Sequence, residues 1–131
     1  MSESGDHKKT ILVIEDEEDL CRNLAYLLQK LGFEVKTAYT GEEGLAMVRE
    51  FRPAAIVLDL MLPGIQGEEV CKAIREDDDE ELQKIPILIV TAKNSDVDRI
   101  VGKVIGANAY LTKPYDFHKL LGEIRKLVPV S

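Results

Sequence analysis

Acidic, hydroxyl and basic side chains follow four short apolar segments of this 131-residue sequence, each where the segment ends. Glu15 and Asp16 follow the first segment, Asp59 follows the second, and Thr91 and Lys113 follow the other two. Three clustered carboxylates repel one another and raise each other's pKa unless a cation neutralises them, and such hard oxygen ligands suit Mg²⁺. A lysine and a hydroxyl nearby supply positive charge and a hydrogen-bond donor for an anion. This combination indicates phosphoryl transfer.

These side chains meet only if the apolar segments are parallel strands, whose carboxyl ends share one edge of a sheet. Short β-branched or wholly apolar runs predict strands over Thr10–Ile14, Phe33–Tyr39, Ala54–Leu58, Ile87–Val90 and Ala109–Leu111. Apolar residues three and four apart predict helices over Leu20–Leu31, Gly41–Phe51, Gly67–Glu76, Val97–Ile105 and Phe117–Leu127. Crossovers between parallel strands are right-handed and long enough to hold a helix. The alternation therefore predicts a doubly wound α/β domain, a five-stranded parallel sheet with five helices.

Length and composition favour one domain, which we expect over residues 10–128 after a flexible polar tail of residues 1–9. Two short features need no chemistry of their own. The acidic run Glu76–Glu81 lies where a helix-to-strand loop is expected and is interpreted as solvated. Cys21 and Cys71 lie in helical apolar patterns without a C-x-x-C motif, so both are predicted to be reduced, buried or half-buried thiols.

The charge balance restricts the partners of this chain. With 17 basic and 24 acidic side chains the formal net charge is -7, which repels nucleic acid phosphates and anionic membranes. No apolar run approaches the ~20 residues of a membrane span, and the polar N-terminus lacks the apolar segment of a signal peptide. We therefore expect a cytoplasmic protein that binds neither nucleic acid nor membrane directly.

Four strings of this sequence resemble the receiver domain of two-component response regulators. They are Ile11–Glu17, Ile56–Gly64, Val90–Ala92 and Ala109–Pro114. The resemblance covers about Lys9 to Val128, and its four strings occur in order at the ends of the expected strands. It implies a flavodoxin-like fold with strand order 2-1-3-4-5, similar to that of the chemotaxis regulators.

The resemblance also implies a role for each polar residue at the sheet edge. Asp59 would be the phosphoacceptor, whose carboxylate attacks the phosphorus of a phosphohistidine on a histidine kinase or phosphotransfer protein. Asp16 and Asp59 would hold Mg²⁺, Glu15 would do so directly or through a water, and the backbone carbonyl of Met61 would be a further ligand. Met61 and Lys93 occupy positions that tune how fast the acyl phosphate is hydrolysed.

A second group of residues would convert phosphorylation into a signal. Thr91 would donate its hydroxyl to a phosphoryl oxygen, and Lys113, placed by a cis peptide before Pro114, would pair with the phosphoryl group. Tyr110 matches the switch aromatic that moves inward as Thr91 moves toward the phosphoryl group. The readout surface would extend from about Ser95 to Leu127, where an output protein or a second copy of the chain would dock.

Three other functions are compatible with a doubly wound α/β domain. A haloacid-dehalogenase-type phosphatase needs a second Asp two residues after its nucleophile, where this sequence has Met61. A nucleotide or flavin module needs a Gly-rich phosphate loop, and neither G-x-G-x-x-G nor G-x-x-x-x-G-K-[ST] occurs. A pseudo-receiver, which acts by constitutive protein contacts, is the remaining alternative. On the main interpretation the chain is a signalling switch that catalyses only its own phosphorylation and dephosphorylation.

Overall fold

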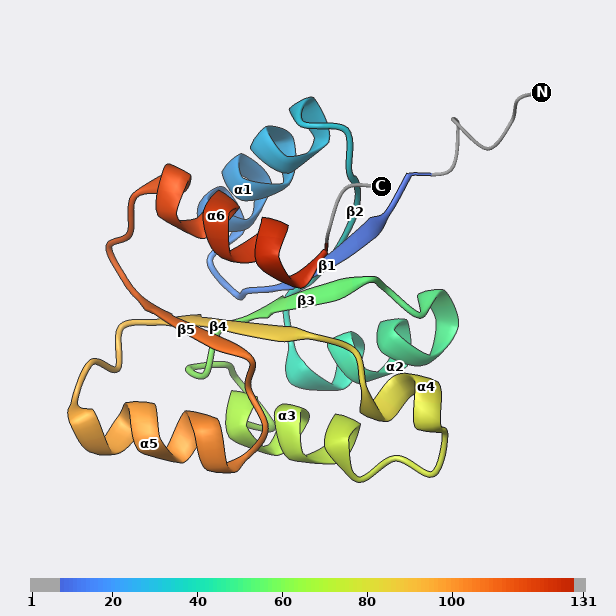
Figure 1. Ribbon diagram of the computed structural model, residues 1–131, viewed down its shortest axis with the longest axis vertical. Helices are drawn as coiled ribbons and strands as arrows, with labels where there is room; N and C mark the ends of the chain where they lie inside the picture. The colour runs from blue at the N-terminus through green and yellow to red at the C-terminus, as the bar shows by residue number, and fades with distance from the viewer. Residues whose placement is uncertain (1–7, 129–131) are drawn as a thin grey trace.

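The computed structural model describes residues 8–128, which form a five-stranded parallel sheet with strand order β2-β1-β3-β4-β5 (Figure 1). The strands are β1 Thr10–Ile14, β2 Glu34–Ala38, β3 Ala55–Leu58, β4 Ile87–Thr91 and β5 Ala109–Thr112. This order and the parallel pairing confirm the fold expected from the sequence. Residues 1–7 of the expected flexible tail lie outside the described residues.

Helices cover both faces of the sheet. They are α1 Glu18–Lys30, α2 Gly41–Phe51, α3 Gly67–Arg75, α4 Glu80–Gln83, α5 Asp96–Val104 and α6 Phe117–Leu127. Figure 1 shows α1 and α6 on one face and α2, α3, α4 and α5 on the other. Within residues 8–128 no helix combines the length and apolar character needed to span a bilayer.

The side chains of each central strand alternate between two apolar cores. On β1, Ile11 and Val13 pack with α1 and α6, whereas Leu12 and Ile14 pack on the opposite face with α2 and α3. Because successive side chains of a strand point to opposite faces, a strand covered by helices on both sides must be apolar throughout. The wholly apolar runs of β3 and β4, buried at every position, follow from this.

The acidic run was predicted to be a solvated loop, and this prediction is wrong in its second half, where the short helix α4 begins. The Asp79 side chain caps this helix by accepting a hydrogen bond from the backbone N–H of Glu81 at 2.9 Å. The Arg52 guanidinium, next to α2, donates to Asp79 at 2.7 Å and also to Glu81. Leu82 of this helix is buried. These contacts give the sheet six helices in place of the expected five.

Helix α5 forms as predicted, but its apolar stripe faces outward. Ser95 caps the helix with a reciprocal capping box to Asp98. Val97, Ile100 and Val104 are 68%, 61% and 79% exposed. Gly102 is the buried residue of α5. This leaves an exposed apolar surface over the helix.

Both cysteines are free and buried, as predicted. Burial raises the pKa of the Cys21 thiol and of the Cys71 thiol to about 11. Both thiols are therefore protonated at neutral pH, and Cys71 donates to the Ile105 carbonyl at 3.4 Å.

A glycine allows α3 to pack against the end of β3. The Gly67 N–H donates to the Leu60 carbonyl at 3.0 Å. A methyl group at Gly67 would lie 2.5 Å from the Asp59 carbonyl oxygen and 2.5 Å from the Leu60 Cα. Both neighbours are backbone atoms, which cannot move aside as a flexible side chain can. The close approach thus fixes the backbone that carries Asp59.

We expect Gly67→Ala to lower the free energy of unfolding by about 2 kcal/mol, the cost of overpacking a tight contact. Urea denaturation of both proteins measures this difference in the free energy of unfolding. Gly122→Ala is the matched control, because Gly122 lies inside α6 with no heavy atom within 4 Å of the added methyl group. That substitution should raise stability by up to about 1 kcal/mol through helix propensity. Equal effects of the two substitutions would contradict the close approach at Gly67.

Candidate functional site

Three carboxylates lie at the carboxyl edge of the sheet. Glu15 follows β1 and Asp59 follows β3, and these strands are neighbours, with the Asp59 N–H donating to the Ile14 carbonyl at 3.0 Å. Glu15 and Asp59 are each only 5% exposed, whereas Asp16 is exposed. One carboxylate oxygen from each of the three residues lies within 4.8 Å of the others. The parallel register thus brings together acidic residues 44 positions apart in the sequence.

The Lys113 ammonium bridges the two buried carboxylates. Its Nζ donates to Glu15 Oε1 and to Asp59 Oδ2, each at 2.8 Å, and lies 3.6 Å from Glu17 Oε1. The Lys113–Pro114 peptide bond is cis, as the resemblance implied. The Lys113 backbone N–H donates to the Thr91 carbonyl at 2.8 Å, which ties the end of β5 to the end of β4.

Burial and charge act in opposite directions on the pKa values of this cluster. Burial raises the pKa of Glu15 above its ordinary value, although the hydrogen bond from Lys113 lowers it. For Lys113, burial alone would lower the pKa, but the hydrogen bonds to Asp59 and Glu15 outweigh it and raise the pKa above its ordinary value. Lys113 is therefore a fixed positive charge. Three carboxylates around one ammonium still leave excess negative charge at the site.

Backbone N–H groups orient the same carboxylates. Met61 N donates to Asp59 Oδ1 at 2.9 Å, and Glu17 N donates to Glu15 Oε2 at 3.0 Å. Met61 N and Lys113 Nζ thus hold the two oxygens of Asp59, one each. The resemblance implied roles for the Met61 carbonyl and for the Met61 position in hydrolysis of the acyl phosphate, but nothing in the sequence indicated the Met61 amide.

The segment after Thr91 is held by contacts with three elements. Thr91 is fully buried, and its hydroxyl oxygen lies 3.4 Å from the Lys93 N–H. The Tyr110 hydroxyl, from β5, donates to the Lys93 carbonyl at 2.9 Å. The Lys93 ammonium contacts Glu68 Oε2 of α3 at 2.9 Å. Thr91, Lys93 and Tyr110, which were singled out from the sequence, therefore lie together, whereas nothing in the sequence indicated Glu68.

The donor set fits a hard divalent cation. Glu15, Asp16 and Asp59 offer only carboxylate oxygens, and Mg²⁺ is held in proteins by a few carboxylates together with substrate phosphate oxygens and water. The charge excess over Lys113 favours a cation in the same place. The described residues thus agree with a magnesium site made of these three carboxylates.

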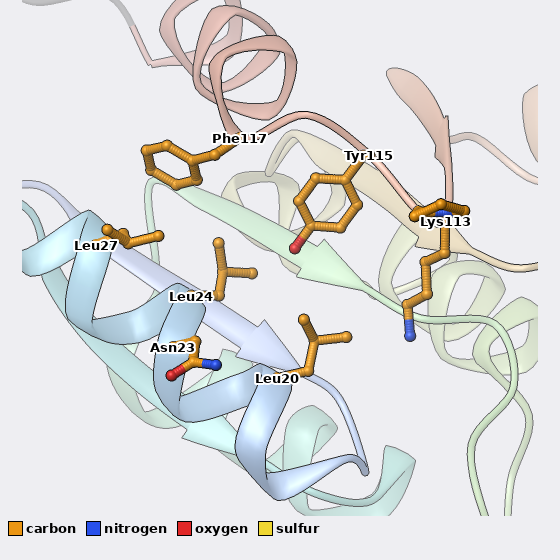
Figure 2. Close-up of a pocket in the computed structure, with 8 residues that line it drawn as sticks. Leu20, Asn23, Leu24, Leu27, Lys113, Tyr115 and Phe117 are labelled. Atoms are coloured by element: carbon orange, nitrogen blue, oxygen red, sulfur yellow. The ribbon is translucent and has the colours of Figure 1, made fainter.

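An apolar groove of about 420 Å³ runs from Lys113 along α1. Figure 2 shows Leu20, Leu24 and Leu27 of α1 pointing toward Tyr115 and Phe117. Leu27 is 38% exposed. The sequence predicted only that these leucines lie in one helix, and it did not indicate the groove, because helical periodicity does not show which part of an apolar stripe stays uncovered.

Comparison with protein families finds one that matches nearly the whole chain. A model of the response regulator receiver domain matches residues 11–125. The transcriptional regulatory protein AfsQ1 of Streptomyces coelicolor is 43% identical over 119 residues, 91% of this chain and 51% of that protein. The sensory transduction protein RegX3 of Mycolicibacterium smegmatis is 40% identical over 119 residues, 91% of this chain and 50% of that protein. The chain spans about half the length of these curated relatives.

Solved structures agree with this result. A putative response regulator from Chloroflexus aurantiacus is similar with a TM-score of 0.86 and 33% identity, covering 95% of this chain and all of that one. The chemotaxis response regulator CheY4 of Vibrio cholerae is similar with a TM-score of 0.85 and 30% identity, covering 92% of this chain and 99% of that one.

The raised pKa of Glu15 predicts a pH-dependent effect of Glu15→Gln. The ordinary pKa of a glutamate is 4.5. Above that pH the folded protein holds the Glu15 proton more tightly than the unfolded chain does. The free energy of unfolding therefore falls as pH rises from there through the raised pKa. Because glutamine cannot ionise, Glu15→Gln should gain stability relative to the unsubstituted protein between pH of about 4 and 7 without divalent metal.

Urea denaturation at both pH values measures this relative gain. Glu18→Gln is the control, because Glu18 lies exposed in the first turn of α1 and should show no such change. A stability difference for Glu15→Gln that is constant across this pH range, or that falls with pH, would contradict the burial cost at Glu15.

Proposed function

The chain belongs to the response regulator receiver domain family, and we propose that it is a phosphorylation-dependent signalling switch with Asp59 as phosphoacceptor. Receiver domains are signalling proteins of two-component systems, not enzymes acting on separate substrates. The single observation that carries the proposal is the setting of Asp59. Its carboxylate is buried at a strand end, contacts the Lys113 ammonium and lies beside two further carboxylates. The proposed switch domain covers residues 10–128.

The proposed step is transfer of one phosphoryl group. A carboxylate oxygen of Asp59 attacks the phosphorus of a phosphohistidine, the P–N bond breaks, and a P–O bond forms while the imidazole leaves and takes a proton. Hydrolysis later breaks the P–O bond by attack of water on phosphorus and releases inorganic phosphate. Positioning and charge stabilisation supply most of the rate in such reactions. The donors that already hold both Asp59 oxygens support this role.

Charge neutralisation involves a metal and residues of the chain. Glu15, Asp16, Asp59 and the carbonyl of Met61 would hold Mg²⁺, which supplies positive charge for the phosphoryl oxygens. Lys113 would transfer part of its hydrogen bonding from Asp59 to the phosphoryl group. Thr91 would turn its hydroxyl toward a phosphoryl oxygen.

The donor would be a histidine kinase or a phosphotransfer protein, and the groove along α1 supports its approach from that side. A protein donor must place phosphorus at Asp59, so it must cover the surface next to the site. The groove begins at Lys113, which contacts Asp59, and continues along exposed apolar side chains such as Leu27 (Figure 2). An exposed apolar surface that borders the site is typical of a protein-binding surface.

The output surface would consist of α5, β5 and α6. The exposed apolar side chains of α5 support a docking role, with an output protein or a second copy of the chain as partner. A phosphoryl group adds roughly 1.5 to 2 negative charges, and Thr91 and Lys113 gain contacts by moving toward it. Tyr110 is bonded to the loop after Thr91, so that loop and the aromatic ring would shift together. Phosphorylation would select this arrangement by differential contacts.

The pseudo-receiver alternative differs in one respect, since it requires no phosphorylation. Such proteins usually lack an acidic, threonine or lysine position of the site, and Glu15, Asp16, Asp59, Thr91 and Lys113 are all present here. The close contacts of Lys113 with Glu15 and Asp59 favour the phosphorylated switch.

We expect acetyl phosphate with Mg²⁺ to add the mass of one phosphoryl group to the chain, and Asp59→Asn to abolish the addition. The substitution is nearly isosteric, so urea denaturation should show a folded protein. Intact-mass spectrometry measures the product, and chelation of Mg²⁺ serves as the second control. Equal phosphorylation of the Asp59→Asn protein would refute the assignment of Asp59. No phosphorylation of either protein would favour the pseudo-receiver.

Tyr110 should carry the change from Asp59 to α5. Beryllofluoride, a phosphoryl mimic, should shift ¹H–¹⁵N resonances both around Asp59 and along α5, and Tyr110→Ala should remove most of the shifts in α5. Tyr26→Ala is the control, because Tyr26 is 58% exposed on α1. Shifts that never extend beyond the residues touching Asp59 would show that the output leaves through another face.

A further inference from the structure

An ion pair joins the segment after β4 to the first turn of α3. Lys93 Nζ lies 2.9 Å from Glu68 Oε2, and the two side chains are 32% and 27% exposed. Lys93 thus contacts α3 through its side chain, while its backbone contacts Thr91 and Tyr110. Thr91 and Tyr110 are the residues proposed to move when Asp59 is phosphorylated. Lys93 is therefore the residue at which β4, β5 and α3 meet.

The other partner, Glu68, is fixed close to the phosphoacceptor. Its neighbour Gly67 packs directly on the Asp59 carbonyl, at a distance that leaves no room for a methyl group. Glu68 therefore directly follows a residue that packs on the backbone of Asp59. Lys113 is already engaged by Glu15 and Asp59. Lys93 is a second cation near the site, and its present partner is a single carboxylate.

We propose that the Glu68–Lys93 ion pair is a latch, in which Glu68 competes with the phosphoryl group on Asp59 for the Lys93 ammonium. This inference rests on the proposed function of Asp59. Glu68 is a positioning residue, since it touches neither donor nor phosphoryl group and acts by holding Lys93. In the unphosphorylated protein the latch is closed, and Lys93 holds the segment after β4 against α3.

Phosphorylation changes the balance between the two anions. The carboxylate of Glu68 carries one negative charge, whereas an aspartyl phosphate brings roughly 1.5 to 2 charges and three acceptor oxygens. A lysine ammonium sits on a flexible four-carbon stem with three donors, so it can change partners without a large backbone movement. On transfer to the phosphoryl group it would shield phosphorus from water. It would also remove the side-chain contact that joins the segment after β4 to α3, and the Tyr110 hydroxyl is bound to the backbone of that segment.

The test is the half-life of phosphorylated Asp59 after acetyl phosphate is removed, followed by intact-mass spectrometry with Mg²⁺ present. Glu68→Gln should lengthen the half-life about two- to fivefold, the factor that corresponds to loss of a partly exposed ion pair. Lys93→Met should shorten it. In the Lys93→Met background, Glu68→Gln should have no further effect, because the residue that Glu68 holds is gone.

Glu69→Gln is the matched control. Glu69 is the next residue of α3 and is exposed, and it does not form the ion pair with Lys93, which is made by Glu68. The substitution removes the same charge from the same end of the helix. The half-life of phosphorylated Asp59 in the Glu69→Gln protein should equal that in the unsubstituted protein. Urea denaturation of each variant confirms that it is folded.

The other possible results distinguish failure of the latch from failure of the proposed function. An unchanged half-life in Glu68→Gln, an equal effect of Glu69→Gln, or a persistent effect of Glu68→Gln without Lys93 would overturn the latch and leave Asp59 as phosphoacceptor. If the unsubstituted protein takes up no phosphoryl group, the proposed function fails and the latch fails with it.

Discussion

The site depends on the Lys113 ammonium, which lies between two carboxylates that the sheet has removed from water. Glu15 and Asp59 sit at the ends of adjacent buried strands, and an unpaired charge at such a position costs several kcal/mol. Lys113 follows β5, which lies beyond β4 in the sheet, and its ammonium contacts one oxygen of each carboxylate. The contact of Lys113 with Glu15 and Asp59 therefore requires this strand order and this register. The negative charge that Lys113 leaves uncompensated suits a metal and a phosphoryl group.

The same sheet edge connects the site to α5 with few contacts. Near its beginning, α5 follows the segment in which Lys93 contacts Glu68 and Tyr110. Just after its end, the Arg75 guanidinium of α3 donates to the Gly106 carbonyl at 2.9 Å. Between these points Gly102 is its buried residue, against the Tyr110 ring. A helix attached in this way can respond to small movements at β4 and β5, which agrees with its proposed part in the output surface.

Much of this arrangement could be predicted from residue types alone. Apolar runs between helical patterns identify parallel strands, and the polar residues at their ends identify the edge at which the strands meet. The sequence alone therefore predicted that Glu15, Asp59 and Lys113 lie together. Periodicity could not show that α5 exposes its apolar stripe, since the pattern is the same whether or not a neighbour covers it. Helix α4 depends on Arg52, which is distant in sequence, and the ion pair of Glu68 with Lys93 depends on the first turn of α3 lying next to the segment after β4.

The most direct measurement is of the Lys113 ammonium itself, by ¹H–¹⁵N spectroscopy of lysine side chains with Lys113→Arg for assignment. The account predicts a Lys113 signal that persists through slowed proton exchange, because two carboxylates hold the ammonium, and a pKa above the ordinary lysine value. Asp59→Asn or Glu15→Gln should speed the exchange. A Lys113 ammonium that exchanges as fast as exposed lysines, and is indifferent to both substitutions, would contradict the account.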